Sequence, residues 1–194
     1  PVTIEAGAEW VPLDLELDIE SGSALDFSNL VPWHAPAGKL GRVVVGAQGK
    51  MVFADQPNDP VRFYGCNLCF SAHYITHEQA DRLAERLQRL GYNAVRFHHY
   101  ERDLVDRSHG DSITLKGEAR DQLDYLFAAL KRRGIYVTTD LFVSRPVFAR
   151  EVWEGATGDV AMNDFKKAVL VNERAFENFK AFVRVLVGHV NPYT

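Results

Sequence analysis

The sequence has few cysteines, and this scarcity limits the redox and metal chemistry open to the chain. Only Cys66 and Cys69 occur among its 194 residues, inside an apolar run that is typical of a strand. Residues three apart on a strand point to opposite faces, so this pair is poorly placed to share a disulfide or a metal ion. The chain has no second pair to complete a zinc site. We therefore expect two buried structural thiols and no metal.

Long apolar runs and an excess of one charge are also missing. No stretch of about 18 apolar residues occurs, which predicts no membrane-spanning helix. The formal net charge is −4, with basic residues scattered among acidic ones, so we expect neither nucleic acid nor a membrane as a partner. The length of 194 residues gives room for one domain, or for one domain plus a small appendage, and 46% hydrophobic and 25% charged residues are an ordinary soluble globular composition. The start at Pro1, without Met or a signal peptide, fits a mature or trimmed form and leaves the compartment open, a secreted or periplasmic one included.

Residues 1–60 predict a small β appendage ahead of the main domain. Apolar and acidic residues alternate over residues 13–19, as in a half-buried strand. Arg42–Val45 and Lys50–Phe53 flank a Gly-containing turn and predict a hairpin. The Pro- and Asn-rich stretch 55–60 predicts a turn that leads into the next strand.

In residues 61–194 the pattern changes to strands that alternate with helices. Strands are expected at residues 61–70, 93–99 and 135–142, and helices at 77–90, 117–133 and from about 172. Thr76 and Gln79 have the spacing of a capping box at the start of the first helix, and Gly91 follows its end. Three successive βα units with short returns predict a parallel sheet with helices outside it.

Such a sheet is either open and doubly wound or closed into a barrel. A doubly wound sheet would carry a glycine-rich phosphate loop after its first strand, and no G-x-G-x-x-G or Walker sequence occurs. Residues 100–116 and 143–171 read as long loops after the second and third strands, where barrel enzymes build their sites. The residues therefore favour an α/β fold in which residues 61–194 form the first three βα units of a (β/α)8 TIM barrel.

Alternation along the second strand sorts its side chains onto two faces. Val95 and Phe97 should pack under the helices, which turns Arg96 and His98 toward the barrel axis at its C-terminal end. An arginine in that position needs a carboxylate partner, because an unpaired buried charge is costly. Arg96 is either half of a structural salt bridge or the group that keeps an anionic nucleophile ionised.

The two adjacent histidines face opposite ways on a strand, which argues against a metal pair. We interpret His98 as a hydrogen-bonding residue of a substrate pocket and His99 as a residue at the surface or behind that pocket. On the third strand, Asp140 shares a face with Phe142 and is either a structural partner of Arg96 or a substrate ligand.

Further candidates for holding a substrate come from the first strand and the loops. Asn67 shares a face with Gly65, and that glycine leaves space for a neighbouring chain segment. The loop aromatics, which either stack on sugar rings or pack in the core, are Tyr74, Tyr100, Phe148 and Trp153.

Several segments in combination carry a resemblance to a known family. A glycine hairpin from Ala37 precedes the run Arg62-Phe63-Tyr64-Gly65-Cys66-Asn67, and the stretch H-E-x-A-D-R-L-A-x-R-L-x-x-L-G-x-N-x-V-R-x-H-H covers residues 77–99. Residues 123–137 and 189–194 continue the pattern. Together they resemble the N-terminal portion of the cellulase-like clan A glycoside hydrolases, over nearly the whole chain. The specificity lies in the combination, since no single motif is diagnostic.

The resemblance implies a retaining hydrolase of a β-linked glycan that needs no metal or organic cofactor. Two glutamates about 5–5.5 Å apart would do the chemistry, one in an Asn-Glu after the fourth strand and one after the seventh. Arg96 matches the family arginine that hydrogen-bonds the nucleophile, and His98 and Asn67 match positions that line the sugar subsite. Phe142 departs from the pattern, because many relatives have His there, which puts in doubt which sugar is held.

A whole barrel takes about 250 residues, so three βα units would need five more to close. We therefore expect the chain to require the remainder of the barrel, from the same gene or a second chain, and a carbohydrate substrate. Neither catalytic glutamate is expected within residues 1–194. The alternatives are a non-catalytic carbohydrate-binding or scaffold protein with a degenerate barrel, and a metal-dependent barrel hydrolase that uses His98.

Overall fold

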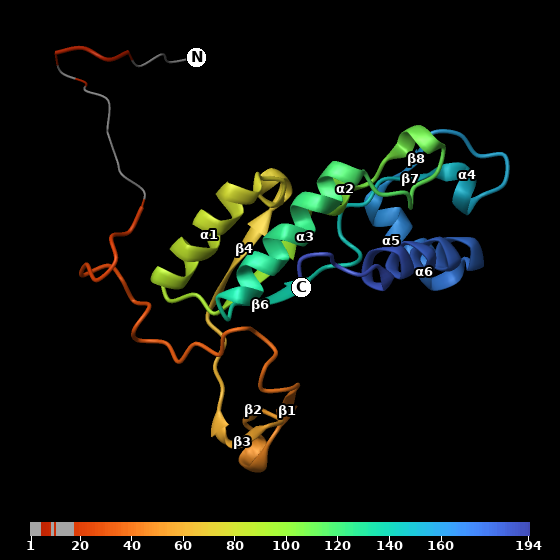
Figure 1. Ribbon diagram of the computed structural model, residues 1–194. Coiled ribbons are helices and arrows are strands. Elements are labelled where there is room, and N and C mark those ends of the chain that lie inside the picture. Colours follow the sequence, from red (N-terminus) through yellow and green to blue (C-terminus); the bar gives the residue numbers. More distant parts are fainter. Residues whose placement is uncertain (1–4, 9, 11–17) are drawn as a thin grey trace.

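The computed structural model describes residues 5–8, 10 and 18–194 (Figure 1). The predicted strand over residues 13–19 lies largely outside these residues. The strands are β1 Val43–Val45, β2 Met51–Phe53, β3 Gln56–Pro60, β4 Gly65–Cys69, β5 Ala94–His98, β6 Tyr136–Thr139, β7 Val147–Phe148 and β8 Asp159–Val160. The helices are α1 His77–Arg89, α2 Glu101–Leu104, α3 Gly117–Arg132, α4 Ala149–Val152, α5 Met162–Val171 and α6 Glu173–Gly188. None of the helices in the described ranges combines the length and apolar character that a membrane span needs.

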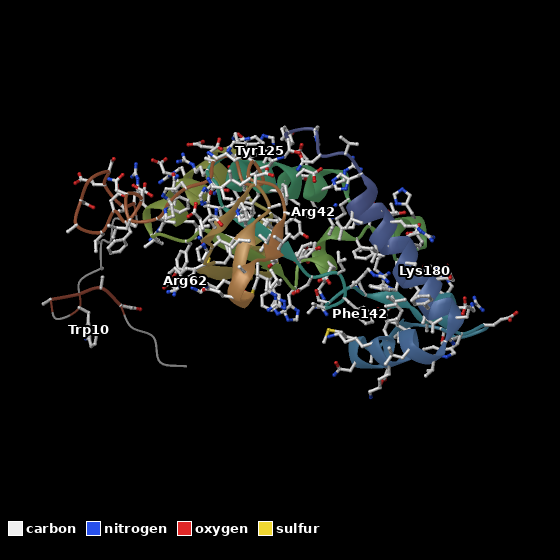
Figure 2. The ribbon with its side chains drawn as sticks, turned by 90° about the horizontal axis from the view of Figure 1, so that it is seen from below. Trp10, Arg42, Arg62, Tyr125, Phe142 and Lys180 are labelled. Atoms are coloured by element: carbon white, nitrogen blue, oxygen red, sulfur yellow. The ribbon has the colours of Figure 1, made fainter. Side chains whose placement is uncertain are left out.

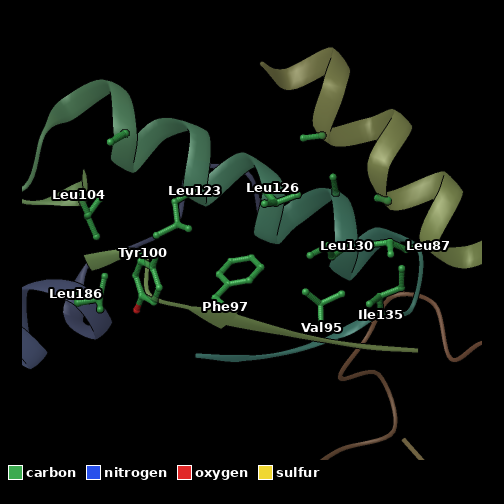
Figure 3. Packing of buried hydrophobic residues seen from close by; sticks show 14 of the residues in the cluster. Leu87, Val95, Phe97, Tyr100, Leu104, Leu123, Leu126, Leu130, Ile135 and Leu186 are labelled. Carbon is green, nitrogen blue, oxygen red and sulfur yellow. The ribbon is translucent and has the colours of Figure 1, made fainter. Parts of the chain in front are cut away.

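The centre of the fold is a three-stranded parallel sheet in the order β4-β5-β6. Figure 3 shows Val95 and Phe97 of β5 pointing toward α1 and α3, which cover that face with a continuous apolar cluster. The opposite face leaves Asn67, Arg96 and Thr138 exposed, side by side in register. The predicted α/β sheet with parallel strands is thus confirmed. Among the described residues it stays open, with β4 and β6 as its edges, and no barrel is closed.

Helix α1 forms as its sequence predicts. The Thr76 hydroxyl accepts a hydrogen bond from the Gln79 N–H at 3.2 Å, and the Gln79 side chain accepts one from the Thr76 N–H at 3.0 Å. This capping box satisfies backbone donors that the first turn would otherwise leave unpaired. Ala80 and Ala84 are completely buried one turn apart, and Gly91 takes up φ +80° just past the end. Helix α3 and the start of α6 at Asn172 also agree with the sequence.

Strand β4 is shorter than the strand predicted over residues 61–70. Its first part pairs elsewhere, because Val61 donates its N–H to the Met51 carbonyl at 2.9 Å. Pairing with β5 begins at Gly65, where an added Cβ would lie 2.4 Å from the Ala94 carbonyl oxygen. Only glycine permits this approach, so the expected role of Gly65 is confirmed.

The N-terminal strands β1, β2 and β3 form an antiparallel meander. The prediction of a turn over residues 55–60 was wrong, because Gln56–Pro60 pairs with β2 as an edge strand. Proline is tolerated there, since an edge strand has one side without ladder hydrogen bonds. Phe53 of β2 is 1% exposed and stacks on Tyr136 at the start of β6, with ring centroids 5.4 Å apart. The meander therefore packs against the N-terminal end of the parallel sheet.

The prediction of a long loop over residues 143–171 was also wrong. This stretch holds the β7–β8 hairpin and helices α4 and α5, which pack with α6 into a second apolar cluster. The third strand ends at Thr139, so Phe142 lies outside it, and Figure 2 shows Phe142 beside α5 and α6. Residues 100–116 likewise contain α2 and a 3₁₀ turn. Apart from α5, these elements have two to four residues, too few to show a hydrophobic period in the sequence.

Both cysteines are free and half-buried rather than buried as predicted. The register sets Cys66 beside Val95 on the helix-facing side and Cys69 beside His98 on the other side. The expectation that they face opposite ways is confirmed. Burial under the helices raises the pKa of the Cys66 thiol.

Candidate functional site

Arg96, His98 and Asp140 meet at the C-terminal end of the parallel sheet, on the face opposite α1 and α3. Arg96 donates from Nε to Asp140 Oδ1 at 3.2 Å and from Nη2 to both carboxylate oxygens at 3.0 Å. Nδ1 of His98 makes a short hydrogen bond with Oδ2 of the same carboxylate. We call these three residues the Arg–Asp–His cluster. Asp140 is thus a carboxylate partner of Arg96, one of the two roles that the sequence offered for it.

Strand pairing sets the position of each member. Val95 and Phe97 are 1% and 2% exposed under the helices, so the alternating residues Arg96 and His98 must point the other way. Asp140 directly follows β6, and its backbone N–H donates to the Phe97 carbonyl at 3.2 Å. The cluster is therefore built on two hydrogen-bonded strands rather than on independent loops.

The Asp140 carboxyl is held in its charged form. Partial burial raises its pKa, but hydrogen bonds from His98 and Arg96 and the charges of both outweigh that effect, and the pKa lies below its ordinary value. Asp140 is therefore an anion at neutral pH and a poor proton donor. Its chemical contribution is to orient the guanidinium of Arg96 and to fix Nδ1 of His98.

The cluster keeps hydrogen-bonding groups that it does not use itself. Nη1 of Arg96 and Nε2 of His98 make no hydrogen bond within the described part of the chain. The Arg96 side chain is 44% exposed, so its free edge is accessible from the open face of the sheet. A guanidinium already fixed along one edge can still bind a carboxylate or a hydroxyl along the other.

Asn67 lies next to the cluster, and Phe142 and Trp153 lie elsewhere. Asn67 is in register with Arg96 on the open face. Phe142 packs on the rings of Phe165 and Phe179, at 5.8 and 4.8 Å between centroids, and so belongs to the second apolar cluster. Trp153 is 42% exposed directly after α4, which Figure 1 places beyond α2 and far from β4.

The other loop aromatics considered for sugar stacking pack in the protein. Tyr100 is 1% exposed and its hydroxyl bonds to Thr139 Oγ1 and to the Asp140 carbonyl, at 2.6 and 2.8 Å. The Tyr74 hydroxyl donates to the Tyr100 carbonyl at 2.6 Å. The ring of Phe148 lies between the guanidinium groups of Arg107 and Arg150. The packing alternative holds for all three aromatics.

Comparisons of the chain with protein-family models, with curated proteins and with solved structures found no match. The geometry of the Arg–Asp–His cluster and the motifs of the sequence are therefore the features that bear on function. In the described ranges, no group of three or more His, Cys, Asp or Glu side chains is placed to hold a metal ion.

Sequence reasoning missed a buried carboxylate close to the cluster, that of Glu101. Its side chain is completely buried and accepts hydrogen bonds from Val143 N at 2.7 Å, Ser144 N at 3.3 Å and Ser144 Oγ at 2.8 Å. Glu101 thereby ties the segment after β5 to the segment after β6. Burial lowers the pKa of the neighbouring Arg145 to about 10, although the charges of Glu151 and Glu101 act in the opposite direction.

Sequence reasoning also missed an unusual aromatic arrangement at the ends of β4 and β5. Phe70 directly follows β4 and His99 directly follows β5, and their rings stack with centroids 5.1 Å apart at an interplanar angle of 21°. Both have a left-handed backbone, with φ +57° and +55°. For a bulky residue this conformation costs on the order of 1–3 kcal/mol. We call Phe70 and His99 the aromatic pair.

We expect the stability difference between wild type and the Asp140→Asn variant to depend on pH, because the Asp140 carboxylate is charged in the folded protein. The folded pKa lies below the ordinary value of an aspartate, so Asp140 contributes stability that is fully present above that ordinary value and is lost as pH falls through the folded pKa. Urea unfolding at several pH values should give a difference between wild type and variant that is constant above about pH 5 and shrinks below it. A difference that stays constant down to pH 2 would show that the lowered pKa contributes nothing.

Proposed function

We propose that the chain forms the first three βα units of a retaining glycoside hydrolase that acts on a β-linked glycan. The observation that supports this best is the free edge of Arg96, exposed beside the C-terminal ends of parallel strands. Active sites of barrel enzymes are built at those ends. The motif resemblance to cellulase-like glycoside hydrolases points to the same residue, because Arg96 matches the arginine that hydrogen-bonds the nucleophile.

In this proposal each member of the site has a distinct role. Asp140 holds Arg96 along Nε and Nη2, and Nη1 binds the nucleophilic glutamate from a later strand and keeps it ionised. His98 and Asn67 offer hydrogen-bonding groups to sugar hydroxyls on the open face. The nucleophile attacks the anomeric carbon while the second glutamate protonates the leaving oxygen, and water then hydrolyses the glycosyl-enzyme.

Glu101 is no substitute for either catalytic glutamate. Both of its oxygens already accept protein hydrogen bonds, and the side chain is sealed from solvent. In this proposal the catalytic pair comes from the remainder of the barrel, which would also cover the free edges of β4 and β6. An uncovered sheet edge is a liability for a protein, so both edges favour such a partner.

The test uses the protein encoded by the complete natural reading frame and, beside it, residues 1–194 alone. We expect the complete protein to hydrolyse aryl β-glycosides, and proton NMR of the first product to show retained anomeric configuration. Residues 1–194 alone should show no turnover. Inverted configuration would contradict the retaining assignment. Glycan binding without turnover would instead favour a non-catalytic carbohydrate-binding protein, and turnover by residues 1–194 would place the catalytic pair within them.

A further inference from the structure

Phe70 of the aromatic pair is exposed where apolar side chains are usually covered, and His99 is half-buried. Phe70 is 60% exposed although it lies beside the central sheet. Its backbone is left-handed, a conformation that bulky side chains avoid. An exposed ring contributes little apolar burial, so packing within the described part of the chain does not explain why Phe70 adopts this conformation. Strain of this kind persists where the surroundings hold it in place, and it concentrates at binding sites.

A buried histidine, His73, stabilises the backbone conformation of Phe70. His73 is completely buried, and its Nδ1 hydrogen-bonds to the Phe70 carbonyl at 2.8 Å. The His73 ring packs edge-on against Phe97, with centroids 5.0 Å apart. Burial lowers the pKa of His73, which keeps the ring neutral with its proton on Nδ1, the nitrogen that faces the carbonyl. The turn that presents Phe70 is therefore anchored in the apolar cluster under the sheet.

The aromatic pair is continuous with the Arg–Asp–His cluster. The ring of His99 lies 4.1 Å from the ring of His98, centroid to centroid, and His98 bonds to Asp140. A flat apolar surface thus adjoins Nη1 of Arg96 and Nε2 of His98, which make no hydrogen bond within the described part of the chain. A pyranose ring in a β-linked glycan matches such a surface, because its C–H groups form an apolar face and its hydroxyls point outward from the rim. Binding sites commonly combine aromatic walls with a few placed polar groups.

We infer that Phe70 and His99 form a stacking platform for a pyranose ring, next to the sugar that the Arg–Asp–His cluster binds. The inference rests on the proposed function for the class of ligand. It adds a subsite that extends from the ends of β4 and β5, with Phe70 as the exposed contact and His73 as the residue that positions it.

The test replaces Phe70 with asparagine in the complete protein. Asparagine tolerates positive φ, so Phe70→Asn removes the ring without adding backbone strain. A second aromatic stack gives the matched control. Tyr64 is 64% exposed and stacks on Tyr92 at 4.9 Å, at the opposite ends of the same two strands. Phe70→Tyr keeps a ring at the site and serves as the conservative variant.

The probes are cellotetraose, mannotetraose and xylotetraose, and binding is measured by calorimetry. We expect Phe70→Asn to weaken the affinity for the tetrasaccharide that wild type binds best by about 5- to 10-fold. Phe70→Tyr and Tyr64→Asn should stay near wild type, and the melting temperature of Phe70→Asn should not fall. A lower melting temperature with unchanged affinity would make Phe70 a packing residue and overturn the inference. So would wild-type binding to none of the three sugars.

Hydrolysis of single-sugar aryl β-glycosides separates this inference from the proposed function. These substrates carry no further sugar for a platform to bind, so their hydrolysis by wild type tests the hydrolase without reference to Phe70. If wild type hydrolyses these substrates and Phe70→Asn binds the tetrasaccharide as tightly as wild type, the platform is contradicted and the proposed function stands. If Phe70→Asn weakens tetrasaccharide binding but wild type hydrolyses no substrate, the proposed hydrolase function is contradicted and the platform stands.

Discussion

Replacing Glu101 by alanine should lower the free energy of unfolding by about 3–5 kcal/mol. The side chain is completely buried, and the variant would leave three donors on Val143 and Ser144 without their acceptor. Each buried donor without a partner costs about 1–3 kcal/mol. The variant would also remove an anion close to the buried guanidinium of Arg145, whose pKa reflects the Glu101 charge. Urea unfolding followed by circular dichroism measures the loss.

Two variants show which property of Glu101 matters. Glu101→Gln keeps the shape but points an amide NH₂ at groups that are themselves donors, so we expect a loss of about half that of alanine. Glu154→Ala removes an exposed carboxylate just after α4 and should change stability by no more than about 0.5 kcal/mol. If Glu101→Ala matched Glu154→Ala, the hydrogen bonds of Glu101 would contribute little to folding.

The parts of the fold that follow from local pattern could be predicted from the sequence. Helix α1 has a capping box and an apolar stripe with helical spacing, and both act within a few residues of each other. The two faces of β5 follow from alternation alone, so Arg96 and His98 were assigned to the correct side. Asp140 could be named as a partner of Arg96 because both expected strands ran in the same direction. These inferences need only short-range geometry and parallel pairing.

The parts that depend on distant contacts could not be predicted. Strand β3 contains Pro57 and Pro60 and looks like a turn until its partner β2 is known. Glu101 is buried by groups more than 40 residues away, and a single glutamate between loop residues gives no sign of this. The left-handed backbone of Phe70 is set by His73 and the strand end rather than by its own residue type. The candidate site was therefore found in part, with its cluster expected and its aromatic pair missed.

The Arg96→Ala variant of the complete enzyme should lose about 10²-fold or more in kcat. A guanidinium that binds the nucleophile lowers the pKa of that carboxylate and fixes its rotamer, and both effects count mainly in the transition state. The free Nη1 edge of Arg96, held in place by Asp140, has the geometry for this role. Arg96→Lys should recover only part of the rate, because an ammonium cannot bind two carboxylates along two planar edges. The acidic limb of the pH–rate profile should move to higher pH in Arg96→Ala, since the nucleophile becomes harder to ionise.

The alternative role, a salt bridge that only supports the sheet, makes a different prediction. Losing it would lower the melting temperature and leave kcat per folded molecule near normal, with an unshifted acidic limb. Thermal unfolding and kinetics on one preparation of each variant therefore decide between catalysis and support. A less stable but fully active Arg96→Ala enzyme would assign Arg96 to the structural role.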